Sequence, residues 1–327
     1  MDPIRWGILG AAKFAREHMG PALHEAAGSR LVALATSDPA KAAAFEAFAG
    51  PLRRHSTPES LLADPEVEAV YIPLPNHLHV EWTLKALAAG KHVLTEKPVA
   101  LAAPEIDRLI AAREASGRLA AEAFMIVHHP QWLRVRELIG SGAIGTLRHV
   151  DAAFSFDNRD PANIRNRPET GGGSLRDIGV YTCGGMRFAT GAEPETLQAR
   201  VIRENGVDVW AQVTGTMAGP GGRFTFSSMT SMRLCQRQEA VFQGELGLIR
   251  LTAPFNAGVF GEARVEVHQP GLKVVTERFP AVRQYRLQVE AFVRSVREGA
   301  AYPCPLEFSR GTQGMLDGIF AVATGID

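Results

Sequence analysis

The first 120 residues alternate short apolar runs with helix-forming segments, and this alternation restricts the possible folds more than any other feature. The apolar runs are Ile4–Leu9, Leu31–Ala35, Ala69–Leu74 and His92–Thr95. Short apolar strands that alternate with helices indicate a parallel sheet covered by helices on both faces. Asp38, Thr57 and Asn76 each precede a helix-forming segment and are expected to cap it. The helix expected from Lys13 meets a Gly-Pro pair at residues 20–21, where we expect an interruption.

The rest of the chain has a different character, because strand-like stretches dominate after about residue 122. They are Leu147–Phe156, Thr196–Arg203, Val207–Met217, Arg223–Ser231, Arg237–Phe242 and Arg264–His268. Helices are expected near 131–141, 175–190 and 284–298. We therefore predict an α/β chain of two domains. Residues 1–122 form a doubly wound parallel sheet, and residues 123–327 form an α+β domain with a large, mostly antiparallel open sheet.

Composition excludes several classes of protein. Lys and Arg total 35, as do Asp and Glu, so no net charge attracts nucleic acid or an anionic membrane. The sequence contains neither a stretch apolar enough to span a bilayer nor a secretion signal. The cysteines Cys183, Cys235 and Cys304 lack metal-binding spacing, so we expect them to be reduced and buried in a cytoplasmic protein.

The first apolar run ends in a turn of small residues. Residues 10–15 read GAAKFA, a degenerate form of the dinucleotide-binding pattern G-x-G-x-x-G/A. Gly10 suits the tight turn and Ala15 permits close helix packing, whereas Ala12 replaces the usual middle glycine. An ordinary strand-to-helix turn would also use small residues, but the following β-α units favour a Rossmann dinucleotide site. We expect Gly10, Ala12, Lys13 and Phe14 to contact the cofactor.

The end of the second run bears on the choice of cofactor. NAD sites usually carry a carboxylate there for the ribose 2′-hydroxyl, but this chain has Thr36 and Ser37. Two neutral hydroxyl residues do not repel a 2′-phosphate, so NADP is favoured, with NAD possible. Asp38 is better explained as a helix cap, because Pro39 follows it.

A series of motifs, in order along nearly the whole chain, closely resembles the Gfo/Idh/MocA oxidoreductases, named for glucose–fructose oxidoreductase and inositol dehydrogenase. The motifs are VYIPLPNHLH at 70–79, HVLTEKP at 92–98, EAFM at 122–125, HP at 129–130, GAIG at 142–145 and GGGSLRDIGVY at 171–181. The final tyrosine is closer to glucose–fructose oxidoreductase, dimeric dihydrodiol dehydrogenase and xylose dehydrogenases than to the histidine-bearing inositol dehydrogenase branch. The resemblance implies a Rossmann domain and a homo-oligomer formed through the C-terminal sheet.

The resemblance also implies hydride transfer between a nicotinamide and a sugar, polyol or related cyclic alcohol. Lys97 follows a parallel strand at the edge where such sheets bind ligands, and Pro98 restricts its backbone. Tyr181 is the expected general acid/base, with its ordinary pKa near 10 lowered by the Lys97 cation. Asp177, four residues earlier on one helix face, would accept a hydrogen bond from a substrate hydroxyl. Without the resemblance, a surface lysine, a helix-start carboxylate and a core aromatic would explain these three residues.

The family pattern assigns further residues to the site. Cofactor contacts are expected from Leu74, Pro75, Asn76, His79, Glu96, Lys97 and Arg165, and a substrate contact from Tyr285. Apart from Arg165, the loop 157–168 looks like an ordinary solvated loop. The histidines at 77 and 79 are expected on the first turn of a helix, and no metal site is predicted.

Two other functions compete with dehydrogenation. A nucleotide-binding regulatory protein without turnover would keep the same fold, but it could lose Lys97 and Tyr181, which are present. Cofactor-assisted glycoside hydrolysis usually accompanies a histidine at position 181, so the tyrosine argues against it. The expected partner is therefore a sugar-like small molecule, with neither nucleic acid nor membrane involved.

Overall fold

The computed structural model describes residues 2–326 and consists of two compact units. The first comprises Met1–His128 with Gln284–Arg310, and the second comprises His129–Arg283 with Gly311–Asp327. The first break lies six residues beyond the predicted boundary at 122, and a later segment returns to the first unit. Helix α8 (Gln284–Glu298) explains this return, because its Phe292 packs on Trp6 of the first strand with ring centroids 4.8 Å apart.

The first unit is built on a six-stranded sheet whose order is β3-β2-β1-β4-β5-β6. Its strands are β1 (Ile4–Leu9), β2 (Ser29–Ala35), β3 (Arg53–His55), β4 (Ala69–Ile72), β5 (His92–Thr95) and β6 (Ala120–Glu122). All five pairings are parallel, which confirms the predicted doubly wound sheet. The chain order reverses between β1 and β4, and ligands of such folds bind outside the carboxyl ends of the strands at this point.

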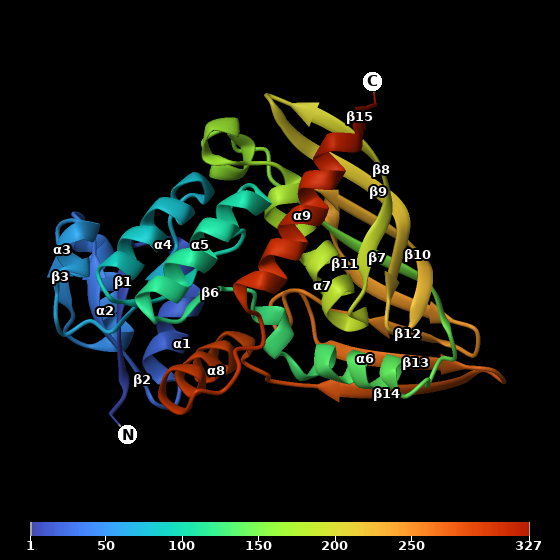
Figure 1. Ribbon diagram of the computed structural model, residues 1–327, viewed down its shortest axis with the longest axis horizontal. Coiled ribbons are helices and arrows are strands. Elements are labelled where there is room, and N and C mark those ends of the chain that lie inside the picture. The colour runs from blue at the N-terminus through green and yellow to red at the C-terminus, as the bar shows by residue number, and fades with distance from the viewer. Residues whose placement is uncertain (1, 327) are drawn as a thin grey trace. The chain divides into compact units, whose positions relative to one another are not determined.

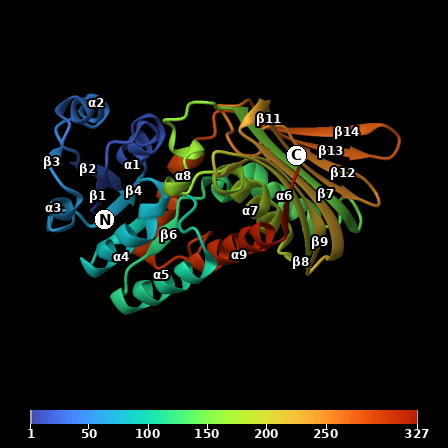
Figure 2. The same ribbon diagram turned by 90° about the horizontal axis from the view of Figure 1, so that it is seen from above.

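Helices cover both faces of this sheet. They are α1 (Gly20–Glu25), α2 (Pro39–Ala49), α3 (Pro58–Leu62), α4 (His79–Ala88) and α5 (Ala103–Ser116), together with α8 and the 3-10 turns η2 (Asn76–Leu78) and η3 (Met125–His128). Figure 2 shows α1 and α2 on one side of the strands and α4 and α5 on the other. Side chains from both faces of the strands are fully buried, with Trp6, Ile8 and Tyr71 on one face and Leu9 and Val70 on the other.

The predicted caps have different outcomes. Asp38 accepts hydrogen bonds from the N–H groups of Ala40 (2.9 Å) and Lys41 (3.3 Å), and Thr57 caps α3, so both predictions are confirmed. The prediction for Asn76 is wrong. Pro75 occupies the cap position, because the chain enters α4 through the 3-10 turn η2, of which Asn76 is the first residue.

The helix after the first turn is continuous, so the predicted interruption is wrong. Residues 15–19 form a wide π turn (η1, Ala15–Met19), and the N–H of Gly20 donates to the carbonyl of Ala15 as α1 begins. Pro21 follows directly after this π turn, which widens the helix at the point where proline's missing N–H would otherwise break α-helical hydrogen bonding. The hydrogen bonds thus change from π to α spacing at Gly20, and the helix continues without a break.

The second unit contains a nine-stranded sheet of order β14-β13-β12-β11-β7-β10-β9-β8-β15. The strands are β7 (Leu147–Asp157), β8 (Glu193–Glu204), β9 (Val207–Gly219), β10 (Gly222–Ser231), β11 (Arg233–Gly244), β12 (Leu248–Leu251), β13 (Ala263–Gln269), β14 (Lys273–Phe279) and β15 (Ala323–Gly325). Only the β7–β10 and β8–β15 pairs are parallel. The predicted large, mostly antiparallel sheet is confirmed, although three of its strands lie outside the predicted set.

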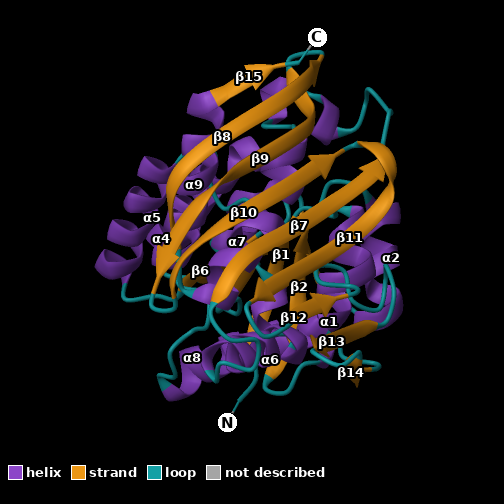
Figure 3. Ribbon diagram, turned by 90° about the vertical axis from the view of Figure 1, so that its right-hand side faces the viewer, coloured by secondary structure: helices purple, strands orange, loops and turns teal. Residues whose placement is uncertain are grey.

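One face of this sheet carries the helices of the second unit (Figure 1). They are α6 (Pro130–Gly140), α7 (Val180–Thr190), the part of α9 (Leu306–Val322) from Gly311 onward, and the short turns η4 (Ile164–Asn166), η5 (Pro168–Thr170) and η6 (Leu175–Gly179). No helix of residues 129–283 or 311–326 covers the other face, which Figure 3 presents to the viewer.

Two predictions from composition concern the burial of the cysteines and the absence of a membrane-spanning segment. Cys183 and Cys304 are buried and free, as predicted. Cys235 is also free but exposed on β11, where pairing with β7 is irregular between Arg233 and Arg237, so its predicted burial is wrong. Within residues 2–326, every helix is too short or too polar to cross a membrane.

Candidate active site

The turn after β1 fits a dinucleotide. Gly10 has a φ of 104°, which disfavours residues with a side chain, and a Cβ there would lie 3.1 Å from Leu74. The turn and the loop after β4 therefore meet at the point where the strand order reverses. Small side chains at positions 11 and 12 leave the turn partly exposed, and Lys13 projects into solvent. These residues fit a bound pyrophosphate, which needs close approach to backbone.

The end of β2 offers no carboxylate of its own to a ribose. The hydroxyl of Thr36 accepts a hydrogen bond from the N–H of Asp38 (3.2 Å), and the Thr36 N–H donates to the carbonyl of His55 (2.8 Å). The Asp38 carboxylate is engaged at the start of α2. The tip of the strand thus presents neutral groups.

Two carboxyl groups hold the turn that carries Lys97. Glu96 accepts hydrogen bonds from the hydroxyl of Tyr71 (2.5 Å) and the N–H of Lys97 (3.2 Å). Glu122 accepts one from the N–H of Val99 (2.9 Å). Burial raises the pKa of both carboxyl groups, that of Glu96 to about 6, whereas the positive charge of Lys97 acts in the opposite direction. Lys97 is joined to Pro98 by a cis peptide bond.

His79 links this turn to the loop after β4. It begins α4, as predicted for the first helical turn, and its side chain is fully buried. Nδ1 lies 2.7 Å from the carbonyl oxygen of Pro98, and Nε2 lies 2.7 Å from that of Leu74. Burial lowers the pKa of His79, while the two carbonyl oxygens favour the protonated ring. These contacts give His79 a bracing role, and its contact with the cofactor stays a prediction. Residues 2–326 contain no group of three potential metal ligands.

Tyr285 lies in the first unit, beside the cofactor turn. At the start of α8, its ring lies 5.6 Å from that of Phe14 and 5.4 Å from that of His18, measured between centroids. Burial, reinforced by the negative charge of Glu96, raises its pKa. Tyr285, predicted to contact the substrate, therefore packs on Phe14, which is predicted to contact the cofactor.

Glycines shape the segment before Asp177 and Tyr181 in the second unit. A Cβ on Gly172 would overlap the carbonyl oxygen of Arg165. Gly173 has a φ of 119°, and a Cβ on it would overlap the carboxylate of Asp208. These close approaches let the loop ending at 170 and the start of β9 pack directly against the turn.

Asp208 is a residue that the sequence analysis missed. Its Oδ2 accepts hydrogen bonds from the Ser174 hydroxyl (2.7 Å) and the Leu175 N–H (2.8 Å). It thereby fixes the start of the η6–α7 helical segment, and burial raises its pKa. A sequence signal was available, because Asp208 stands between two valines in a strand.

The structure brings together two residues that were assigned to different ligands. Arg165, predicted to bind the cofactor, places its Nε 2.6 Å from Oδ2 of Asp177, predicted to bind the substrate. The Tyr181 ring is buried, with its centroid 5.8 Å from those of Phe154 and Phe255. Tyr181, Asp177 and Arg165 belong to the second unit, and Lys97 belongs to the first.

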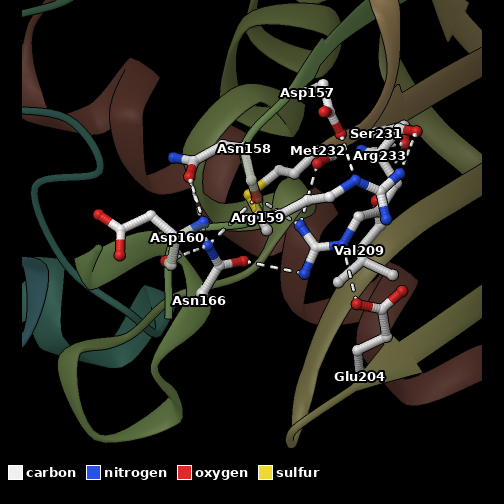
Figure 4. A network of polar contacts seen from close by, with 10 residues as sticks. All are labelled: Asp157, Asn158, Arg159, Asp160, Asn166, Glu204, Val209, Ser231, Met232 and Arg233. Atoms are coloured by element: carbon white, nitrogen blue, oxygen red, sulfur yellow. Dashed lines mark hydrogen bonds and ion pairs between the residues drawn. The ribbon is translucent and has the colours of Figure 1, made fainter. Parts of the chain in front are cut away.

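The loop 157–168 is held by a polar network (Figure 4) and is not simply solvated. Arg233 donates to the carbonyl of Asn158 (2.5 Å), to Oδ1 of Asn166 (3.1 Å) and to Glu204 (2.8 Å). Asn166 in turn donates to the carbonyl of Asp160 (2.8 Å). Arg233 and Asn166 thus fix the backbone next to Arg165. Sequence reasoning missed both, since Arg233 lies far along the chain.

Comparisons with known proteins agree with this architecture. A family model described as "Oxidoreductase family, NAD-binding Rossmann fold" matches residues 4–124, and one described as "GFO/IDH/MocA C-terminal domain" matches residues 132–250. The dTDP-3,4-didehydro-2,6-dideoxy-alpha-D-glucose 3-reductase of Saccharopolyspora spinosa is 36% identical, over 93% of this chain and 90% of that protein. D-xylose 1-dehydrogenase (NADP(+)) 2 of Haloferax volcanii is 33% identical, over 98% and 97%.

A solved structure gives the same result. The 3-ketoreductase from Actinomadura kijaniata, in complex with NADP and TDP-benzene, is 29% identical with a TM-score of 0.88, and the match covers 99% of both chains. The family matches lie in the predicted order and extend over both units. The chain therefore belongs to the Gfo/Idh/MocA family and is an NAD(P)-dependent oxidoreductase that acts on CH–OH groups.

Proposed function

We propose that this enzyme catalyses NADP-dependent hydride transfer at a hydroxyl-bearing carbon of a sugar or cyclic polyol, with Lys97 and Tyr181 acting on the substrate oxygen. The observation that carries the proposal is the construction around Lys97. Its turn stands at the carboxyl edge of the sheet and is held by Glu96, Glu122 and His79. A surface lysine without a role would not need two buried side chains and a partly buried carboxyl group around its backbone.

In this proposal Tyr181, Lys97 and Asp177 have different roles in the reaction. The nicotinamide, when bound, supplies the hydride acceptor or donor. In the oxidation direction, the Tyr181 oxygen accepts the proton of the substrate hydroxyl, and the Lys97 ammonium stabilises the negative charge that develops on the substrate oxygen. In reduction the same proton returns to the carbonyl oxygen. Asp177, oriented by Arg165, holds a neighbouring hydroxyl of the substrate.

The loop arginines favour a neutral sugar over a nucleotide-linked one. Three arginines lie between residues 157 and 168, where they would be available to a diphosphate. Each forms an ion pair within its own unit: Arg159 with Asp157, Arg165 with Asp177 and Arg167 with Glu169. The pairs of Arg159 and Arg167 are exposed and weak, so the argument rests on Arg165 and Asp177, whose carboxylate is largely buried. A diphosphate would have to compete with this carboxylate for Arg165, whereas a neutral sugar uses it as a hydrogen-bonding group.

NADP is the proposed cofactor because the end of β2 is neutral at Thr36 and Ser37. The relatives support this choice, since the xylose dehydrogenase is named for NADP(+) and the ketoreductase structure contains NADP. Lys13, which is exposed on the turn after β1, adds a positive charge to the predicted cofactor turn. In the complex we expect Gly10, Ala12, Phe14, Leu74 and Pro75 to contact the dinucleotide.

A substrate screen with both cofactors tests the proposal. Aldoses, polyols, dihydrodiols and dTDP-linked keto sugars are compared by the absorbance of the reduced nicotinamide. We expect turnover of free sugars with NADP. Turnover confined to dTDP-linked substrates would contradict the neutral-sugar assignment. If NADP binds but no compound turns over, the regulatory alternative gains support.

A further inference from the structure

A second polar pocket lies at the amino edge of the parallel sheet. It has a volume of about 330 Å³, and Glu68, Lys91, His92, Arg118 and Arg297 are among its lining residues, all from the first unit. Glu68, Lys91 and Arg118 lie just before the adjacent strands β4, β5 and β6. The amino ends of parallel strands share one edge, so the sequence positions alone bring these charges together. The cofactor turn and Lys97 lie at the carboxyl ends of the strands.

Positive charge exceeds negative charge in this pocket. Three of the lining side chains are cationic, and Glu68 is the one acid among them. Glu68 is already paired, since Nη2 of Arg297 lies 3.0 Å from its Oε1. The Lys91 ammonium donates to the carbonyls of Asp64 and Val67, both at 2.7 Å, which occupy two of its three N–H donors but do not neutralise its charge. The Asp64 carboxylate also acts on this charge, but it already pairs with Arg53 (2.9 Å). Lys91 and Arg118 therefore leave an excess of positive charge.

Arg118 and Arg297 both have guanidinium N–H groups that can donate further hydrogen bonds. The Arg118 guanidinium lies near Gly90, where a Cβ would be 4.0 Å from Nη2, and it forms no ion pair within residues 2–326. Nε of Arg297 is buried and has no hydrogen-bond partner among the described residues. A buried guanidinium N–H without an acceptor is costly unless a ligand or water supplies one.

His92 contributes a donor with a fixed tautomer. Its Nδ1 accepts a hydrogen bond from the N–H of Leu119 (2.9 Å), so the neutral ring carries its proton on Nε2. Burial, together with the charges of Arg118 and Arg297, lowers the pKa of His92 to about 4. The ring is thus a neutral donor at physiological pH, and both guanidinium groups lie close enough to act on it.

We propose that this pocket binds the phosphate group of a small phosphorylated metabolite. Guanidinium groups present paired N–H donors that match phosphate oxygens, and Lys91 adds a point charge behind them. The volume exceeds that of a phosphate, which leaves room for a short carbon skeleton. This ligand is distinct from the cofactor, because Lys97 lies five residues after His92 across β5 and the turn that follows it, about 16 Å away at roughly 3.3 Å per residue.

Calorimetric titration of the full-length protein tests the proposal. NADP is kept saturating so that the phosphate sites of the cofactor are filled, and sodium phosphate is compared with sodium chloride at equal ionic strength. We expect one phosphate site in the wild type that chloride does not reproduce. Glycerol 3-phosphate should bind at the same site, in competition with phosphate, since the pocket accommodates more than the phosphate group.

Two variants test separate parts of the pocket. Arg118→Gln removes an exposed cation and should weaken phosphate binding by about tenfold or more, the usual effect of losing a charged hydrogen bond. His92→Asn retains an acceptor for the Leu119 N–H but loses the Nε2 donor, and it should also weaken binding without a change in charge. Arg30→Gln, at an exposed arginine of the same unit, is the matched control and should leave phosphate affinity unchanged.

The same measurements can overturn the proposal. Absence of a phosphate-specific signal in the wild type would do so, as would unchanged affinity in either pocket variant. Equal weakening in Arg30→Gln would show only diffuse attraction. Unchanged NADP affinity and thermal unfolding midpoints in the absence of phosphate establish that each variant is folded. His92→Asn also decides the matter independently if Arg118→Gln proves unstable.

Discussion

At Tyr181 the packing of the ring and the chemistry of the hydroxyl can be separated by one substitution. Tyr181→Phe retains the ring that packs on Phe154 and Phe255, so we expect the fold and NADP affinity to be preserved. Turnover should fall about 10²–10⁴-fold, the usual range for a lost general acid–base group. Tyr302→Phe makes the same chemical change at another buried ring and should remain close to wild type. Steady-state rates and NADP titration measure both effects, and a fully active Tyr181→Phe enzyme would contradict the assignment.

Lys97 is expected to act together with Tyr181. Lys97→Ala should also abolish most turnover, and the double variant should be hardly slower than the slower single variant, because residues that form one catalytic unit are not additive. Additive losses would indicate that the two residues serve separate steps. A double-mutant cycle on turnover at saturating substrate distinguishes these outcomes.

Glu96 makes stability depend on pH in a direction that can be worked out. Its pKa is about 6 in the folded protein and 4.5 in the unfolded reference, so between these values the folded state retains a proton that the unfolded state releases. Stability from this group is therefore present below pH 4.5 and is lost as pH rises through about 6, by about 2 kcal/mol in total.

Glu96→Gln removes this titration and can still accept the hydrogen bond from Tyr71. The difference in unfolding free energy, variant minus wild type, should increase by about 2 kcal/mol between pH 4.5 and 7. Urea unfolding without cofactor measures it. The buried histidines, such as His92 with its pKa lowered to about 4, give the opposite slope in both proteins and cancel in the difference. Parallel stability curves would show that the raised pKa is incorrect.

Among the elements, the turn before η6 depends on a glycine. Gly173→Ala would force a side chain into the left-handed region and against Asp208, which holds Ser174 and Leu175. We expect a loss of at least about 1–3 kcal/mol, the cost of such strain, and a larger loss of turnover through the displaced Tyr181 helix. Gly221→Ala, where a Cβ meets open space, is the control. Thermal unfolding and activity assays would contradict this view if the two variants behaved alike.

Arg233 is proposed as a positioning residue for the loop that carries Arg165. Arg233→Lys keeps the charge but cannot reach Asn158, Asn166 and Glu204 at once, because lysine lacks the planar fork. We expect faster amide hydrogen exchange in residues 157–168 and a raised KM with a smaller change in kcat. Arg237→Lys, at an exposed position on the same strand, is the control. Unchanged exchange in the loop would exclude the positioning role.

These elements also indicate how far sequence reasoning extends. Short apolar strands and capping residues such as Asp38 are local signals, so the parallel sheet and most helix starts could be predicted. The pairing of Arg165 with Asp177 could not, because it depends on where a loop without periodicity meets a helix. The position of Asp208 between two valines was a usable signal of a buried polar residue, but only the folded turn shows that it holds Ser174 and Leu175. The Gly-Pro pair at 20–21 marks the place of the π turn η1 but does not reveal its hydrogen-bond spacing. The turn η6 is also a π turn, and its residue types do not reveal that spacing either.

For the molecule as a whole, the unit on which a segment packs was harder to predict than whether the segment is a helix or a strand. Helix α8 was predicted at 284–298, but its sequence does not reveal that it packs on the first unit. Its partners are set by Trp6 and Phe14, nearly the whole chain length away. Long-range packing of this kind leaves no local pattern, and for that reason a single boundary at 122 could not describe the two units.

The uncovered face of the nine-stranded sheet is where we expect two copies of the chain to associate. Outward-facing residues near its centre include Ala153, Ser227, Met229 and Val241, which are small or apolar. They line a hollow of about 510 Å³, whose lining also includes the charged residues Asp151, Arg237 and Glu239. A sheet face of this kind, left without helices in residues 129–283 and 311–326 (Figure 3), suits a symmetric interface in which each copy presents the same patch.

Met229→Arg tests this association, because it introduces a charge at the centre of the outward face. The side chain alternates with Ser228 and Thr230, which are buried on the helix-covered side, so the substitution should leave the core intact. Light scattering should give twice the 35.3 kDa chain mass for the wild type and the single-chain mass for the variant. Ala43→Arg, on an exposed position of α2, adds the same charge elsewhere and should stay dimeric. A monomeric wild type would contradict the prediction outright. A dimeric Met229→Arg protein with native stability would move the interface to another surface, since a symmetric interface centred on this patch would bring the two introduced arginines together.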